Sequence, residues 1–189
     1  LILLDDVPLY YVNHLGGFAS VFNPDIIKNT ELIKGGFPAR YGNRLSSVLD
    51  VRMDDGNAHA FKGQGSVGLL TTRLALEGPL HDSATSYMVS ARRFMWDMLL
   101  MYPVTLALSE GTHGFGYTFY DVNAKMNHKL SANDHLYGSF YYGDDRLTNR
   151  MFALTSLDDE KMKNVLGWGN LMGSLRWNHV FNPRLFSNV

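Results

Sequence analysis

Apolar and polar residues alternate along most of the chain after residue 57. A period of two residues is typical of β-strands with one apolar and one polar face. The alternating segments are residues 65–77, 86–93, 117–129, 135–143 and 166–181, and residues 185–189 begin another. We therefore predict an antiparallel sheet of five or six strands over residues 58–189.

The alternation assigns side chains to opposite faces of this sheet. The apolar face is predicted to carry Leu70, Leu74, Val122, Met126, Leu171 and Leu175. The polar face is predicted to carry Thr71, Asn123, Lys125 and Asn170. In a transmembrane barrel the first set would point outward to lipid and the second would line the lumen.

The predicted connections between strands alternate in length. Short turns are expected at residues 78–85, 130–134 and 182–183, and long connections at residues 94–116 and 144–164. Short turns at one end and long loops at the other are the layout of an outer-membrane β-barrel. A soluble β-sandwich or lipocalin-like barrel has strands that alternate in the same way, and the sequence does not show which face points outward.

Residues 1–57 have a different, mixed α/β pattern. Strands are predicted at residues 2–4, 30–34 and 46–53. A short helix is predicted to begin after Asn23, a potential N-cap followed by Pro24, and to continue through Lys28. The turn at residues 54–57 separates this segment from the alternating strands.

Composition excludes several classes of protein. The 189 residues carry 17 Lys+Arg and 18 Asp+Glu, and this balance argues against a nucleic-acid binder. The chain has no cysteine and therefore no disulfide framework or thiol nucleophile. It also has no run of 18 apolar residues that would predict a transmembrane helix. Both ends read as interrupted strands, so we interpret the chain as a fragment.

Catalytic and cofactor motifs are not convincing. Residues 63–68 match G-x-G-x-x-G, but they lead into an alternating strand and not into a helix, so a dinucleotide site is rejected. The seven histidines have no metal-ligand spacing, and no Ser/His/Asp set marks a nucleophile. We therefore predict no enzyme activity, no cofactor and no metal.

Three blocks in the first 57 residues resemble the plug domain of TonB-dependent outer-membrane receptors. They are residues 3–10, which end a strand in a D-D-V-P turn, residues 23–36, a helix-then-strand block, and residues 37–51, a P-A-R-Y-G block with the last plug strand. The amino-acid sequences of these blocks are similar to those of the branch found in Bacteroidetes-type bacteria. Asp6 departs from the family pattern, in which glycine is usual.

The resemblance implies a fold, a location and a function. Residues 1–57 would be the C-terminal part of the plug, and residues 58–189 the first strands of a barrel of about 22 strands. The protein would lie in the outer membrane of a Gram-negative, Bacteroidetes-type bacterium and take up a nutrient such as a siderophore or glycan, driven by TonB. Implied partners are outer-membrane lipid, TonB through an N-terminal region outside this chain, the nutrient and a surface lipoprotein, without nucleic acid.

Two groups of site residues follow from this reading. The loop with Tyr10, Tyr11, Asn13 and His14 is predicted to face the ligand, because phenols, an amide and an imidazole suit hydrogen bonding and stacking. Alternatively, its tyrosines pack the plug against the barrel wall. Plug-to-barrel contacts are predicted for Arg40, Arg44 and Arg52, with lumen carboxylates such as Asp121 or Glu77 as partners.

Two other functions stay open at this point. A passive or adhesive small outer-membrane barrel would need a closed, even set of strands within this length. A soluble carbohydrate-binding β protein would fold as a monomer without detergent.

Overall fold

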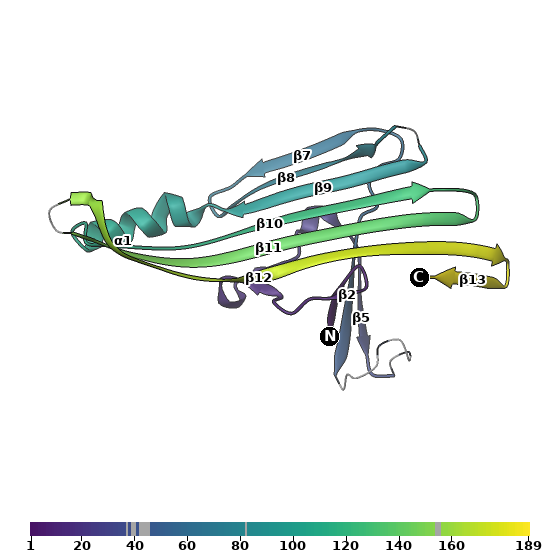
Figure 1. Cartoon of the computed structure of the whole chain (residues 1–189), viewed down its shortest axis with the longest axis horizontal. Helices are drawn as coiled ribbons and strands as arrows, with labels where there is room; N and C mark the ends of the chain where they lie inside the picture. The colour runs from purple at the N-terminus through teal and green to yellow at the C-terminus, as the bar shows by residue number, and fades with distance from the viewer. Residues whose placement is uncertain (37, 39–40, 42–45, 82, 154–155) are drawn as a thin grey trace.

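The computed structural model describes residues 1–189 except 37, 39–40, 42–45, 82 and 154–155, and it consists mostly of β-strands (Figure 1). A seven-stranded antiparallel sheet, called the large sheet below, follows chain order from β7 to β13. Its strands are β7 (Lys62–Val67), β8 (Thr71–Pro79), β9 (Thr85–Phe94), β10 (His113–Lys129), β11 (Asp134–Ala153), β12 (Ser156–Asn182) and β13 (Leu185–Asn188).

Residues 1–57 form a separate four-stranded sheet, the small sheet, in the order β2-β1-β6-β5. These strands are β1 (Ile2–Leu4), β2 (Val7–Pro8), β5 (Ile27–Lys34) and β6 (Ser47–Met53), and β1 pairs with β6 in parallel. A two-stranded ribbon of β3 (Asn13–His14) and β4 (Ala19–Ser20) encloses the 3-10 turn η1 (Leu15–Gly17). The strands of the small sheet run across the long strands of the large sheet (Figure 1).

The helix predicted after Asn23 is only one 3-10 turn, η2 (Pro24–Ile26). The N-cap prediction is confirmed, because the side chain of Asn23 accepts a hydrogen bond of 3.2 Å from the backbone N–H of Asp25. The helix does not continue to Lys28, since Ile27 is already extended and begins β5. Among the described residues of the first 57 there is no α-helix.

Two predictions for the large sheet are wrong. Residues 65–77 are not one strand, because β7 and β8 form a hairpin whose turn contains Leu69 and Leu70. Residues 144–153 and 156–164 do not belong to a long loop, because they are paired in β11 and β12. The predicted strands at 86–93 and 117–129 and the short turn at 130–134 are confirmed.

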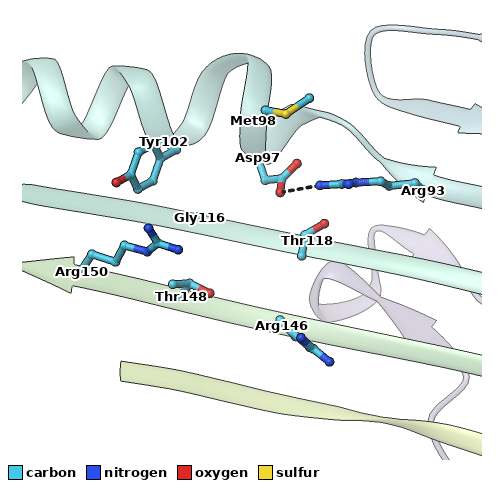
Figure 2. Close-up of a pocket in the computed structure, with 9 residues that line it drawn as sticks. All are labelled: Arg93, Asp97, Met98, Tyr102, Gly116, Thr118, Arg146, Thr148 and Arg150. Carbon is cyan, nitrogen blue, oxygen red and sulfur yellow. Dashed lines mark ion pairs between the residues drawn. The ribbon is translucent and has the colours of Figure 1, made fainter. Parts of the chain in front are cut away.

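The connection between β9 and β10 is helical. The π-helical turn η4 (Asp97–Met101) continues into α1 (Tyr102–Leu108), which lies along β10 (Figure 2). Close approach needs glycine at this point, because a Cβ at Gly114 would clash with the ring of Tyr102. In the part of the chain that the structure describes, no helix has the length and apolar character needed to cross a membrane.

A small apolar core joins the two sheets. It includes Leu4, Ile26 and Met53 from the first 57 residues, packed with Met88 and Tyr141 from the large sheet. Residues 1–57 therefore pack against one face of the large sheet.

Candidate functional site

The covered face of the large sheet is its polar face. Asp121, Asn123 and Lys125 alternate along β10 and are at most 5% exposed, because residues 1–57 lie over them. On the opposite face, the part away from η4 and α1 is apolar and uncovered in this chain, with Leu171 and Leu175 each more than 70% exposed. This arrangement is the reverse of a water-soluble β protein, which buries its apolar face.

The first cluster of buried polar side chains between the two sheets is centred on His14 in β3, which is 1% exposed. Its Nε2 lies 2.8 Å from Oδ1 of Asp121 in β10, and its Nδ1 lies 2.7 Å from Oδ2 of Asp145 in β11. The imidazole stacks on the ring of Phe119 with centroids 4.1 Å apart. A neutral imidazole donates through one nitrogen only, so bonds from both nitrogens to carboxylates require the charged form.

Further donors complete the hydrogen bonding of these two carboxylates. Arg92 donates from Nε to Asp121 Oδ2 at 2.6 Å and from Nη2 to the carbonyl of Ser20 at 2.7 Å. The hydroxyl of Tyr141 donates to Asp121 at 2.9 Å, and that of Tyr117 donates to Asp145. With His14 charged, two cations balance two buried carboxylates, as a stable buried cluster requires.

The environment of His14 acts on its pKa in two directions. Burial alone would lower the pKa, but the hydrogen bonds and negative charges of Asp121 and Asp145 outweigh it and raise the pKa above 6.5. His14 is therefore a positively charged link from the small ribbon to the large sheet.

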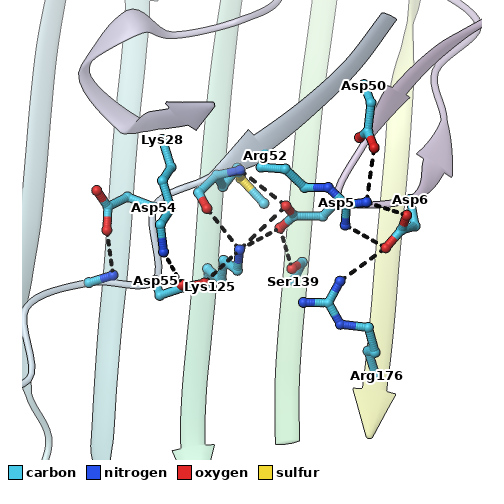
Figure 3. Close-up of polar contacts among 12 residues, drawn as sticks. Asp5, Asp6, Lys28, Asp50, Arg52, Asp54, Asp55, Lys125, Ser139 and Arg176 are labelled. Atoms are coloured by element: carbon cyan, nitrogen blue, oxygen red, sulfur yellow. Dashed lines mark hydrogen bonds and ion pairs between the residues drawn. The ribbon is translucent and has the colours of Figure 1, made fainter. Parts of the chain in front are cut away.

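A second buried cluster lies around Lys125 (Figure 3). Its Nζ lies 2.9 Å from Asp55 and 3.3 Å from Asp5, and it donates to the carbonyl of Met53 at 2.8 Å. Asp5 also accepts from the hydroxyl of Ser139 at 2.6 Å. Burial would raise the pKa of Asp55, but Lys28 and Lys125 lower it below the usual value. These contacts keep the Asp55 carboxylate charged.

The turn between β1 and β2 presents Asp5 to this cluster and Asp6 to two arginines. Asp5 and Asp6 both have positive φ angles, of 46° and 71°, as the central residues of a type I′ hairpin turn do. Asp6 accepts two hydrogen bonds from Arg52 at 2.5 and 2.6 Å and one from Arg176 of β12 at 3.0 Å. Burial would raise the pKa of Asp6, but these two arginines lower it overall.

Three arginines were predicted to join residues 1–57 to the large sheet, and the structure describes one of them. Arg40 and Arg44 lie outside the described residues. Arg52 binds Asp6 and Asp50, both within residues 1–57, and among the described residues it reaches the large sheet only through Asp6. Its expected pairing with Asp121 or Glu77 is wrong. Asp121 is bound by Arg92 and His14, and Glu77 lies 3.8 Å from Lys62.

The residues of the predicted ligand-facing loop differ in how far they are buried. Tyr10 and Tyr11 are 83% and 52% exposed, whereas His14 is buried as described above. Asn13 is exposed and pairs through its backbone with Ser20. The amide of Asn170 in β12 holds the backbone of Tyr11, accepting from its N–H at 3.2 Å and donating to its carbonyl at 2.6 Å. The loop backbone is thus fixed while both phenol rings face solvent.

Solved structures that match this chain include two siderophore receptors. The siderophore receptor PirA from Acinetobacter baumannii is 13% identical, with a TM-score of 0.49 over 95% of this chain and 32% of that chain. The ferric enterobactin receptor PfeA from Pseudomonas aeruginosa, in complex with enterobactin, is 16% identical, with a TM-score of 0.46 over 100% of this chain and 36% of that chain. The chain thus spans about a third of the length of these receptors. No family model and no curated protein matches it.

A cavity of about 510 Å³ opens beside the polar face, next to β7 and β8. Its lining includes Asp25, Asp54 and Glu77, with Lys62 and Gln64. It contains none of the residues predicted for the ligand-facing loop. Within the described residues, no group of three or more His, Asp or Glu side chains is arranged to hold a metal ion.

Proposed function

We propose that this chain is the plug segment and adjoining barrel strands of a TonB-dependent outer-membrane receptor. The observation that carries the proposal is the inverted large sheet, whose apolar side chains are exposed while its polar face binds residues 1–57. A lipid-facing wall around a polar, plugged lumen has this arrangement. A soluble binding protein would expose its polar face instead.

The edges of the large sheet support a larger barrel over a small closed one. β7 and β13 are the two ends of the strand order and do not pair with each other. Open edges are not tolerated in hydrocarbon, where every backbone N–H and C=O needs a partner. We therefore assign residues 1–57 to the plug and residues 58–189 to the first strands of a barrel that further strands complete.

The plug in this proposal is held mainly by polar contacts. His14 and Asp5 bind the wall through ion pairs and hydrogen bonds, beside a small apolar core. Breaking a buried ion pair is costly when the charges stay dry, but water entering the lumen can solvate both partners. Force from TonB on the plug would therefore separate these contacts and open a path, with no chemistry required of the chain itself.

Ligand binding is assigned to Tyr10, Tyr11 and Asn13, and His14 anchors their loop. The two exposed phenols suit stacking on, and hydrogen bonding to, a polar nutrient such as a siderophore or glycan. A Bacteroidetes-type outer membrane, TonB and a surface lipoprotein complete the proposed setting.

The decisive experiment measures energised uptake by the intact protein in Gram-negative cells. A panel of labelled ferric siderophores and oligosaccharides is supplied to cells with and without TonB. The proposal predicts that one ligand binds in both strains and is accumulated only when TonB and the proton-motive force are present. Equal accumulation without TonB would identify a passive channel instead.

A further inference from the structure

A second cavity, of about 320 Å³, lies on the other face of the large sheet, beneath η4 and the start of α1 (Figure 2). Gly116, Thr118, Arg146, Thr148 and Arg150 alternate with the residues that face the first 57, so they belong to the face opposite that segment. The remaining lining residues are Arg93, Asp97, Met98 and Tyr102.

Positive charge predominates around this cavity. Arg93 lies 3.8 Å from Asp97, and Arg146 binds Asp144 at 2.6 Å. Arg150 stacks over the ring of Tyr102, 5.7 Å from its centroid, and Lys163 is its register partner on β12. Among these charged residues, the four cations exceed the two carboxylates by two.

The cavity also contains hydroxyl groups suited to an anion. The Thr118 hydroxyl is buried and has no hydrogen-bond partner among the described residues. Thr148 follows Arg146, the register partner of Thr118, by two residues along β11 and therefore belongs to the same face. Guanidinium groups bind phosphate through paired N–H donors, and hydroxyl groups add single donors.

The position of the cavity indicates the source of the anion. It lies on the same face as the apolar residues, next to the Tyr120–Tyr142 pair where that apolar surface ends. The neighbouring helix exposes large apolar side chains, which are Met98, Leu99, Leu100, Val104 and Leu108. An apolar surface bordered by aromatic residues and then by cations matches the passage from acyl chains to headgroups.

We propose that this cavity binds the phosphate of an outer-leaflet lipid, with Arg93, Arg146 and Arg150 on the phosphate and the apolar side of η4 and α1 against the acyl chains. The inference rests on the proposed membrane location and goes beyond uptake of a nutrient. Bound lipid would fix the helix at the membrane boundary.

The test titrates the intact protein in detergent with two lipids and follows binding by native mass spectrometry. The lipids are bisphosphorylated lipid A and the same lipid after enzymatic removal of both phosphates. The Arg93→Gln/Arg146→Gln double variant changes two side chains that are both about half exposed, so folding is preserved. The matched control is Arg184→Gln, in the exposed turn before β13.

We expect the double variant to weaken binding of the phosphorylated lipid about tenfold or more, with the control unchanged. Inorganic phosphate at the same concentration should not displace the lipid. Equal affinity for both lipids, equal affinity in the double variant, or displacement by inorganic phosphate would each overturn the proposal. The three results that overturn the lipid proposal would not contradict the proposed receptor function. Absence of the full-length protein from the outer-membrane fraction would contradict that function.

Discussion

At the scale of single residues, His14 is the charged side chain of the β3–β4 ribbon that binds the large sheet. It is buried between Asp121 and Asp145, and no other described cation bonds Asp145. Replacing it leaves a buried carboxylate without its charged partner, a change that costs about 3–5 kcal/mol in comparable sites.

The first prediction concerns this contact and its dependence on pH. Since the pKa of His14 is raised above 6.5, its contribution is complete below pH 6.5 and is lost as pH rises through the raised value. Hydrogen exchange of β3 and β4 in the intact protein, corrected for intrinsic rates, should therefore accelerate as pH rises from 6.5.

In the His14→Gln variant, exchange should be fast at every pH, because glutamine carries no charge to lose. The control His59→Gln alters an exposed histidine and should behave like the unchanged protein. Protection in His14→Gln equal to that of the unchanged protein at pH 6 would show that the ribbon is held in another way.

The second prediction concerns the exposed part of the loop. Tyr11→Ala and Asn13→Ala should weaken binding of the nutrient, each by about 1–2 kcal/mol, without changing assembly or melting. The backbone contact of Tyr11 with Asn170 does not depend on the phenol ring and should survive. Asn133→Ala, in the turn between β10 and β11, is the control. Loss of stability with unchanged affinity would mean that the loop is structural.

The sequence placed His14 in a loop predicted to face a ligand and did not predict its carboxylate partners. It lies 107 and 131 residues from the two carboxylates, and no local spacing encodes contacts over that range. Asp121 was assignable only to the polar face of its strand. Arg52 was misassigned for a related reason, since its partner Asp6 becomes available only through the hairpin turn of β1 and β2.

At the scale of elements, alternation located strands well where one face is apolar. It failed at residues 144–152, where Asp144, Arg146 and Thr148 make the second face polar too, so a paired strand resembled a loop. It also failed at residues 68–70, because the turn between β7 and β8 contains two leucines and lacks the usual polar residues.

The third prediction tests how α1 is held on β10. In Gly114→Ala the new Cβ would clash with the ring of Tyr102, so the helix should move away from β10 and become easier for chymotrypsin to cleave. Cleavage between residues 95 and 112 should be several-fold faster, with the melting of the sheet unchanged. Gly138→Ala is a matched control, because a Cβ at that position meets no atom within 4 Å. Equal cleavage of the two variants would mean that the helix does not depend on this contact.

At the scale of the whole molecule, the proposed membrane location depends on which face of the large sheet meets lipid. The alternation of apolar and polar residues in the sequence does not show which face of the sheet points outward. The packing of residues 1–57 on the polar face shows that the apolar face is the outer one. Leu74, Val122, Met126, Leu171 and Leu175 belong to the opposite face. Leu70, predicted to share it, lies instead in the turn before β8.

The most direct test is site-directed spin labelling of the intact protein in lipid bilayers, which is simple because the chain has no cysteine of its own. Adjacent residues on opposite faces form matched pairs, namely Val122→Cys with Asn123→Cys and Leu171→Cys with Asn170→Cys. We predict that labels at Val122 and Leu171 collide with dissolved oxygen and are shielded from a water-soluble nickel chelate, while labels at Asn123 and Asn170 show no such lipid signature. Lipid contact at Asn123 and Asn170, or equal access of the chelate to all four positions, would contradict a membrane-spanning wall.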